Sequence, residues 1–250
     1  MAGHSHSANI ARRKGAVDAK RGKVFSKIAR VIISAARVGG PDMDTNLKLK
    51  YAVEKAKAAN MPKDNIERAI KRGSGSKDGD DFEELNYEGY APGGVALLIT
   101  CLTDNRNRTA PDIKHIFERG NGNLGAPGSV SFMFDLRSTF AIEAGGRDED
   151  ALTELALEVG AEDVELDGDV AVLYAAATEF VATKAALEER GEAFLSAELA
   201  YVPQNRVPIN DEQEAEKLLK LIAALDDHED VQSVYANYDM PSEWIDKLSA

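Results

Sequence analysis

Apolar residues recur at helical spacing three times near the start of the chain. In residues 24–38 they fall at steps of three and four on one helix face, at Val24, Ile28, Ile32 and Ala35. Similar spacing predicts a second helix over residues 45–59 and a third from Pro62 to Gly73, because proline suits the first turn of a helix and glycine its end. Three such helices predict a small bundle preceded by an N-terminal arm.

Beyond residue 81 the pattern changes to short apolar runs that alternate with helical segments. The intervening sequence GSGSKDGDD (73–81) is rich in Gly, Ser and Asp, which cannot build a core, so it marks a boundary. Strands are predicted over residues 95–102, 129–134, 139–143, 163–166, 170–174, 197–201 and 231–237. Helices are predicted over residues 107–119, 149–159, 179–190 and 211–225.

The order of these elements predicts a multidomain protein. A basic N-terminal helical bundle precedes two α+β domains of the ferredoxin-like βαββαβ type, one inserted in the other. The inserted unit is complete by itself, whereas the βαβ fragment before it and the helix and strand after it would together complete a second unit. The predicted domains are residues 1–76, residues 77–136 together with 205–250, and the inserted residues 137–204.

Charge is divided unevenly along the chain. The net charge is −13, but residues 1–72 contain 17 Lys and Arg against 6 Asp and Glu, a net charge of +11, which leaves −24 for residues 73–250. Such asymmetry is typical of a protein whose basic part contacts nucleic acid or a membrane surface. The apolar helix positions lack the Trp and Leu enrichment of interfacial helices and are needed for the bundle core, which favours nucleic acid.

The basic part contains a dense set of cations that forms the candidate nucleic-acid-binding site. Only Asp18 opposes this run. A solvated helix face also carries Lys and Arg, but an ordinary face intersperses acids among them, so the run is interpreted as a phosphate-binding surface. The candidates from this region are Arg12, Arg13, Lys14, Lys20, Arg21, Lys23, Lys27 and Arg30.

Motifs for catalysis or ligand binding are weak. The sequence GNGNLG (120–125) matches a dinucleotide-binding pattern, but it follows a predicted helix and precedes a strand, so it is interpreted as a turn. His4 and His6 offer too few fixed ligands for a closed metal site and are expected in a flexible, solvated tail. His115 and His228 belong to no recognisable motif. We therefore predict no enzymatic activity, cofactor or metal.

The single cysteine and the N-terminal residues bear on the cellular compartment. Cys101 lies in an apolar run, where a buried, inert thiol is expected, and one cysteine cannot form an intramolecular disulfide. No run approaches the roughly 18 apolar residues of a membrane span, and residues 1–7 lack the features of a secretory signal. A cytosolic protein without membrane contact is therefore expected.

Several long motifs resemble the YebC/PmpR family, and the resemblance covers nearly the whole chain. They are MAGHS (1–5), DAKRGK (18–23), NMPKDNIERAI (60–70), YEGYAPGGVA (87–96) and LTDNRNRT (102–109). The resemblance implies a three-domain protein that is a probable transcriptional regulator binding DNA. The family also includes translation factors, among them mitochondrial translational activators. Met43 stands where the family pattern has proline, and residues 137–146, where the inserted domain is predicted to start, follow the pattern loosely.

The resemblance also implies particular site residues. The family's basic positions match Lys14, Lys20, Arg21, Lys23 and Lys27, which are the implied nucleic-acid contacts. Arg106 and Arg108 in LTDNRNRT are further candidates, although Asp104 or Asn105 in the same motif could simply cap the following helix.

The predicted function is that of a non-enzymatic DNA-binding regulator of transcription, and the alternative is a ribosome-associated translation factor that binds RNA. The same cationic surface serves both, and the sequence has neither an RNP-type aromatic motif nor a recognisable helix-turn-helix. A protein-interaction scaffold, a third class, would show no salt-sensitive nucleic-acid binding. The acidic α+β domains are expected either to face a protein partner or to shield the basic domain until it docks.

Overall fold

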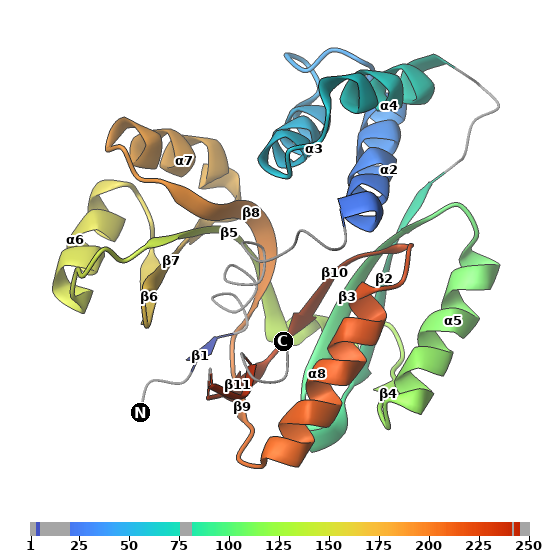
Figure 1. Ribbon diagram of the computed structural model, residues 1–250, viewed down its shortest axis with the longest axis vertical. Coiled ribbons are helices and arrows are strands. Elements are labelled where there is room, and N and C mark those ends of the chain that lie inside the picture. The colour runs from blue at the N-terminus through green and yellow to red at the C-terminus, as the bar shows by residue number, and fades with distance from the viewer. Residues whose placement is uncertain (1–3, 6–20, 76–81, 242, 246–250) are drawn as a thin grey trace.

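The computed structural model describes residues 4–5, 21–75, 82–241 and 243–245, and it contains three main units (Figure 1). The helical unit comprises three helices within residues 21–75. The first sheet unit combines residues 83–124 with residues 212–236, and the second sheet unit comprises residues 134–203. Each sheet unit has a four-stranded sheet and two helices. Among the described residues, no helix has the length and apolar character needed to cross a membrane.

The helical unit consists of α2 (Arg21–Gly39), α3 (Leu47–Ala58) and α4 (Lys63–Gly75). Buried Asn46 joins the end of α2 to the start of α3. Its side chain accepts a hydrogen bond from the Leu49 N–H at 3.1 Å and donates to the carbonyls of Ala35 and Gly40, each at 2.8 Å. The predicted apolar face packs as expected, with a core that includes Ile28, Ile32, Leu49, Val53 and Ile66.

The prediction that Gly73 ends the third helix is wrong. Gly73 is buried within α4, which continues to Gly75. A Cβ at Gly73 would lie 2.4 Å from the carbonyl oxygen of Ile33 and 2.8 Å from the Cβ of Ala36. Glycine is therefore needed at this position because α4 packs closely on the backbone of α2.

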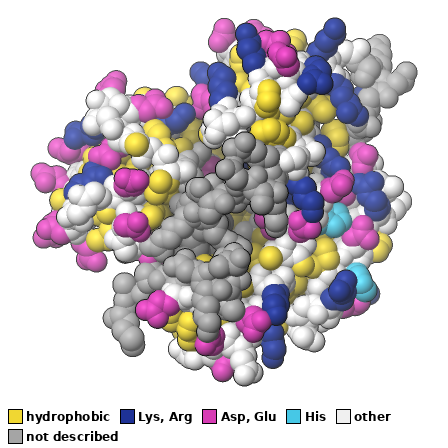
Figure 2. Space-filling model, viewed as in Figure 1, with side chains coloured by type: hydrophobic (Ala, Val, Ile, Leu, Met, Phe, Trp, Pro, Cys, Tyr) yellow, Lys and Arg dark blue, Asp and Glu magenta, His cyan; other side chains and the backbone are white. Residues whose placement is uncertain are grey.

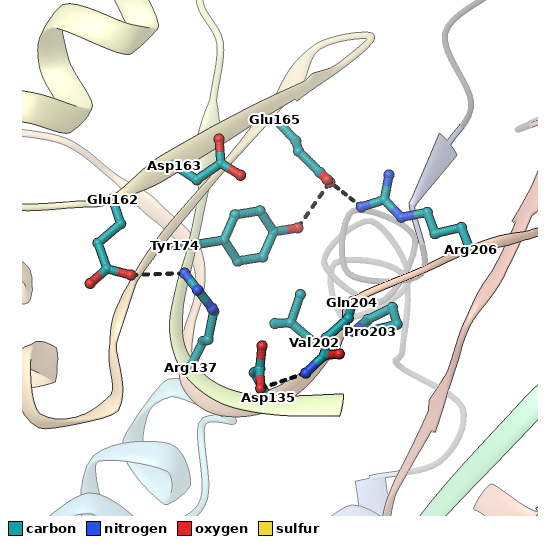
Figure 3. A pocket seen from close by; sticks show the side chains of 10 residues that line it. All are labelled: Asp135, Arg137, Glu162, Asp163, Glu165, Tyr174, Val202, Pro203, Gln204 and Arg206. Carbon is teal, nitrogen blue, oxygen red and sulfur yellow. Dashed lines mark hydrogen bonds and ion pairs between the residues drawn. The ribbon is translucent and has the colours of Figure 1, made fainter. Parts of the chain in front are cut away.

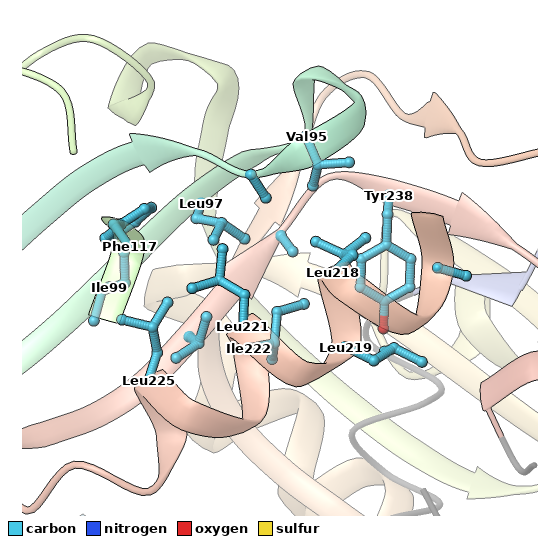
Figure 4. Close-up of a cluster of buried hydrophobic side chains, with 14 of the residues drawn as sticks. Val95, Leu97, Ile99, Phe117, Leu218, Leu219, Leu221, Ile222, Leu225 and Tyr238 are labelled. Atoms are coloured by element: carbon cyan, nitrogen blue, oxygen red, sulfur yellow. The ribbon is translucent and has the colours of Figure 1, made fainter. Parts of the chain in front are cut away.

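The first sheet unit has the strand order β10-β3-β2-β4, with every neighbouring pair antiparallel. The strands are β2 (Glu83–Tyr90), β3 (Ala96–Thr103), β4 (Asn123–Leu124) and β10 (Val231–Ala236). The helices α5 (Arg106–Arg119) and α8 (Glu212–Asp226) pack against one face. Figure 4 shows this core, in which Leu97 and Ile99 of β3 face Phe117 of α5 and an apolar row on α8 formed by Leu218, Leu221, Ile222 and Leu225.

Three elements in and after this unit differ from the prediction, one of them β4, which lies in the segment GNGNLG predicted as a turn. Strand β2 was not predicted, because only Leu85 and Tyr87 alternate among its charged and polar residues, a composition common in strands near a sheet edge. The strand predicted over residues 129–134 is instead a short 3₁₀ turn, η2 (Ser131–Met133), that leads into the next sheet. The observed order is thus ββαβ followed by αβ, and the expected second βαββαβ unit is corrected accordingly.

The second sheet unit has the element order β5-α6-β6-β7-α7-β8 and the strand order β6-β7-β5-β8. All neighbouring strands are antiparallel. Both helices share one core with the sheet, in which Leu152 and Leu187 pack with Phe140 and Leu173. The bounds are β5 (Phe134–Glu143), α6 (Glu149–Glu158), β6 (Asp163–Asp167), β7 (Val170–Ala176), α7 (Phe180–Glu189) and β8 (Phe194–Pro203).

A small third sheet includes residues near the start of the chain. Strand β1 (His4–Ser5) pairs with β11 (Tyr238–Met240), which also pairs with β9 (Val207–Pro208). The expectation of a flexible tail is therefore wrong for the backbone of His4, which lies in a strand opposite Met240. His6 lies outside the described residues.

The helical unit contacts both sheet units. Tyr51 of α3 packs edge-on against Phe180 of α7, with ring centroids 5.1 Å apart, and Lys184 of α7 binds Glu54 of α3 at 3.0 Å. The two sheets also contact each other, where Tyr201 of β8 meets Tyr235 of β10 at 5.4 Å. These contacts fix which faces of the helices remain available to a partner.

Candidate nucleic-acid interface

Three of the predicted phosphate-binding cations lie on one face of α2. Lys23, Lys27 and Arg30 are spaced by four and three residues, which places them on the same side of a helix. All three contact the segment from the last residue of α8 to the residue before β10, Asp226–Asp230, which is called the acidic loop below. This face of α2 is therefore turned toward the first sheet unit.

The first two cations bind the exposed end of the acidic loop. The ammonium of Lys23 donates to both carboxylate oxygens of Asp227, at 2.7 and 2.8 Å. The ammonium of Lys27 contacts the carbonyl of Asp226 and lies 3.6 Å from its carboxylate. The Lys27 side chain is only 16% exposed, and burial lowers its pKa despite the opposing effect of Asp226.

The third cation, Arg30, reaches the buried end of the loop. It donates to the carboxylate of Glu229 at 3.0 Å and to that of Asp230, which is 1% exposed. Arg108 of α5 donates to the same Asp230 carboxylate at 2.9 and 3.2 Å. Two predicted phosphate ligands that are 78 positions apart in the sequence thus share one carboxylate.

Asp230 is held by hydroxyl groups as well as by the two guanidinium groups. The buried hydroxyls of Thr103 and Thr109 donate to it at 3.2 and 2.8 Å. Burial alone would raise the pKa of Asp230, but the hydrogen bonds from Arg108, Thr109 and Arg30 outweigh it and keep the pKa below the ordinary value for aspartate. Asp230 is therefore a stably ionised group that connects α2, α5 and β10.

These contacts correct the picture of a freely exposed cationic face. The sequence around α2 contains almost no acids, and that local deficit favoured an open phosphate-binding surface. The structure supplies acids to Lys23, Lys27 and Arg30 from a segment about 200 residues further along the chain. Contacts of this kind depend on tertiary packing and cannot be predicted from the spacing of charges along the sequence.

The motif LTDNRNRT has a structural role. The side chain of Asn105 caps α5 by accepting the Arg108 N–H at 3.2 Å, as the capping interpretation expected. Arg108 is bound by Asp104 as well as by Asp230. Arg106 is more open, since its side chain is 69% exposed and lies 3.9 Å from Glu83.

Five of the predicted contacts lie wholly or partly outside the described residues. Arg12, Arg13, Lys14 and Lys20 lie outside the described residues, and Arg21 opens α2 but its side chain also lies outside them.

Further exposed cations lie on α3 and α4, and the predicted site did not include them. Figure 2 shows Lys and Arg side chains gathered over the helical unit, at the top of the view. Lys50 and Lys57 of α3 and Lys71 of α4 are exposed. Residues 21–75 contain 13 Lys and Arg against 5 Asp and Glu, a net charge of +8. This excess, which continues past α2, is the sequence signal that could have extended the site.

A polar pocket of about 580 Å³ lies in the second sheet unit and beside Arg206 (Figure 3). Its charged side chains are largely engaged with one another. Glu165 accepts hydrogen bonds from the Tyr174 hydroxyl and from Arg206, while Arg137 binds Glu162 at 2.9 Å. Both arginines of the pocket are therefore engaged by carboxylates.

The remaining motifs serve packing. The predicted turn GNGNLG forms a turn only at its start, because Asn123–Leu124 are strand β4. A Cβ at Gly122 would lie 2.8 Å from the Tyr90 carbonyl oxygen and 3.0 Å from the Phe117 ring, so the segment fits closely against the core. Cys101 is 2% exposed, and burial raises its pKa to about 12. Within the described residues, no group of three or more His, Cys, Asp and Glu side chains could hold a metal ion.

A basic three-helix unit joined to two antiparallel sheet units defines a multidomain α+β protein. Residues 5–76 match the TACO1/YebC protein N-terminal domain, and residues 82–238 match the TACO1/YebC second and third domain. The chain belongs to this family, as its motifs predicted.

Similar proteins of the same family match this chain over nearly its whole length. A protein of Syntrophobacter fumaroxidans named as a probable transcriptional regulatory protein is 49% identical and covers 100% of both chains. One of Aquifex aeolicus with the same name is 48% identical over 99% of this chain and 100% of its own. The crystal structure of a conserved hypothetical protein from Aquifex aeolicus matches with a TM-score of 0.82 and 47% identity, over 90% of this chain and 92% of the other.

Proposed function

We propose that this protein is a non-enzymatic regulator that binds nucleic acid through its helical unit, and that its physiological target is DNA in the control of transcription. The names of its relatives as probable transcriptional regulatory proteins support this reading. The observation that carries it is the net charge of +8 on residues 21–75 within a chain whose net charge is −13. Concentrated positive charge on an otherwise acidic chain attracts phosphate to one surface.

The exposed face of α3 and α4 is the proposed point of first contact. Lys50, Lys57 and Lys71 are exposed, whereas the apolar positions of the same helices are buried against α2. Lysine side chains on such a face bind phosphate without reading bases, so they supply affinity and orientation but little specificity. The predicted contacts Arg12, Arg13, Lys14, Lys20 and Arg21 belong to the same proposal as further phosphate ligands.

The division into residues 1–76, residues 77–136 with 205–250, and residues 137–204 belongs to the same proposal. It is supported by the separate apolar cores of the helical unit and the two sheet units. It is also supported by the sheet that residues 83–124 share with residues 231–236. Under this division the basic surface and the acidic sheets are distinct modules of one chain.

The test is a triple variant in which Lys50, Lys57 and Lys71 are replaced by alanine. Binding to a mixed-sequence DNA duplex should weaken, and the slope of log K against log salt should flatten by about 2.7 if all three contact phosphate. A matched control replaces the exposed Lys114, Lys217 and Lys220 by alanine, which removes the same charge from the first sheet unit. Equal effects of the two variants would overturn the assignment of the surface.

The same titration with single-stranded RNA decides the kind of nucleic acid. A DNA-binding regulator should bind the duplex more tightly at equal salt. Tighter binding to RNA would overturn the proposed target in favour of a translation factor, and absence of binding to either at 50 mM salt, a condition that exaggerates charge attraction, would overturn the proposed function.

A further inference from the structure

The acidic loop has carboxylates at the C-terminal end of α8, where negative charge is unfavourable. Asp226 is the last residue of α8, and Asp227 is its C-terminal cap. The C-terminal end of a helix carries a partial negative charge, so carboxylates there are unfavourable for the helix itself. What balances them in the structure is the cationic face of α2, through Lys23 and Lys27. The charge of this loop therefore serves the contact with α2 and not the stability of α8.

The contacts between the loop and α2 fall into two groups. The outer carboxylates are open to water, with exposed side-chain fractions of 66% for Asp226, 45% for Asp227 and 79% for Glu229. An ion pair with both partners exposed, such as Lys23 with Asp227, contributes only about 0–1 kcal/mol and weakens with salt. Lys27 and Arg30 are more buried than the hydrated carboxylates that they bind. The inner carboxylate, Asp230, is 1% exposed and is also held by Arg108. The outer pairs can therefore dissociate while the inner one stays in place.

The loop is also anchored within its own sheet unit. The Nδ1 atom of His228 accepts the Asp230 N–H at 3.2 Å, and its Nε2 atom lies 3.5 Å from Asp112 of α5. Thr103 and Thr109, which bind Asp230, also belong to the first sheet unit. Release of the outer pairs would thus leave the loop attached to its own unit and to Arg30, while Lys23 and Lys27 lose their carboxylate partners.

Carboxylate oxygens lie where phosphate oxygens would bind these cations. Lys23 has two carboxylate oxygens of Asp227 at 2.7 and 2.8 Å, and Arg30 has one of Glu229 at 3.0 Å, which are ordinary lengths for charge-assisted hydrogen bonds. We infer that the acidic loop is an internal mimic of phosphate that masks the cationic face of α2, and that nucleic acid displaces its outer carboxylates. This inference rests on the proposed function, whose α3 and α4 surface supplies the first contact.

The experiment neutralises the outer carboxylates in the full chain through Asp226→Asn, Asp227→Asn and Glu229→Gln. The control variant carries Glu149→Gln, Asp150→Asn and Glu154→Gln on α6, in the second sheet unit, which changes net charge equally. Freeing Lys23 should steepen the salt slope on duplex DNA by about 0.9, and by about 1.8 if Lys27, which keeps its hydrogen bond to the Asp226 carbonyl, also binds phosphate. These slopes correspond to about 4-fold and about 20-fold tighter binding at about 0.2 M salt. The control should change affinity by less than about threefold, because salt screens remote charges.

A second pair of variants assigns the gain to α2. Lys23→Gln and Lys27→Gln are introduced together into the wild type and into the loop variant. The loss of affinity should be much larger in the loop variant, because the loop already occupies these lysines in the wild type. Far-UV circular dichroism and urea titration confirm that each variant is folded.

The outcomes separate the inference from the proposed function. If the wild type binds DNA but the loop variant binds no more tightly than the control, or if the lysine and loop substitutions act additively, the masking is overturned and the proposed function stands. If neither the wild type nor the loop variant binds duplex DNA or RNA, both are overturned.

Discussion

The substitution Asp230→Asn would remove one negative charge from the point where α2, α5 and β10 meet. The Asp230 side chain is 1% exposed and accepts hydrogen bonds from Arg30, Arg108, Thr103 and Thr109. Asparagine has almost the same size, so Asp230→Asn changes the charge and the hydrogen bonds while leaving little cavity. The α2 contact and the start of β10 should both weaken.

The expected loss of stability follows from the surroundings of the carboxylate. Removing one partner of a buried ion pair costs about 3–5 kcal/mol. The lower end of this range, about 3 kcal/mol, is expected because Arg30 retains Glu229, Arg108 retains Asp104, and both guanidinium side chains are partly exposed. The control Asp226→Asn removes a carboxylate that is 66% exposed and should cost less than about 1 kcal/mol.

Urea unfolding followed by tryptophan fluorescence measures this difference. Trp244 is the single tryptophan of the chain and packs against the core of the first sheet unit, so it reports on the unit that contains Asp230. At an m value of about 1–3 kcal/mol per molar urea, a loss of 3 kcal/mol lowers the midpoint by about 1 M or more. The m value should stay unchanged.

The pH dependence provides a second measurement. Because the pKa of Asp230 is depressed in the folded protein, its stabilisation is fully present above the pKa of the unfolded chain, about 3.9, and is lost as pH falls through the folded pKa. The gap between wild type and Asp230→Asn should therefore be full at pH 7 and should shrink below about pH 4. A loss at pH 7 no larger than that of Asp226→Asn, or a gap that persists unchanged in acid, would refute the reasoning.

Substitution or labelling at three other residues has a specific expected result. Gly73→Ala should lower the free energy of unfolding, measured by thermal unfolding, by about 1–3 kcal/mol, because the new Cβ would meet the Ile33 backbone. Gly22→Ala, whose Cβ would have nothing within 4 Å, should be neutral or stabilising. Equal effects of the two substitutions would contradict the close packing of α4 on α2. Cys101, with a pKa raised by burial to about 12, should resist a thiol reagent at pH 8 in the folded protein and react at once in guanidinium chloride; rapid labelling of the folded state would argue against its burial. Glu88 accepts the N–H groups of Gly128, Val130 and Ser131 at 2.7–2.8 Å, so Glu88→Gln should lower stability at pH 7 by about 1–3 kcal/mol. Hydrogen exchange at those amides should rise, and unchanged protection would contradict their dependence on the carboxylate.

The family and much of the secondary structure could be predicted because their signals are local. A helix that buries one face repeats apolar residues every three or four positions, as Ile28 and Ile32 do in α2. The cap of α5 could also be anticipated, since Asn105 lies directly before the helix that it caps. Strand β2 and the 3₁₀ turn at residues 131–133 could not, because β2 is polar and the turn depends on Glu88, which is more than 40 residues earlier.

The sequence by itself determined that positive charge is concentrated in residues 1–72, because charge composition needs no coordinates. Only the tertiary structure decided which of those cations face water and which face carboxylates. Lys23, Lys27 and Arg30 look open along the sequence, yet each binds a residue about 200 positions away, and Arg108 joins Arg30 at Asp230. The physical reason is that the strength of an ion pair depends on distance in space and on burial, and both are set by how α2 packs against the end of α8.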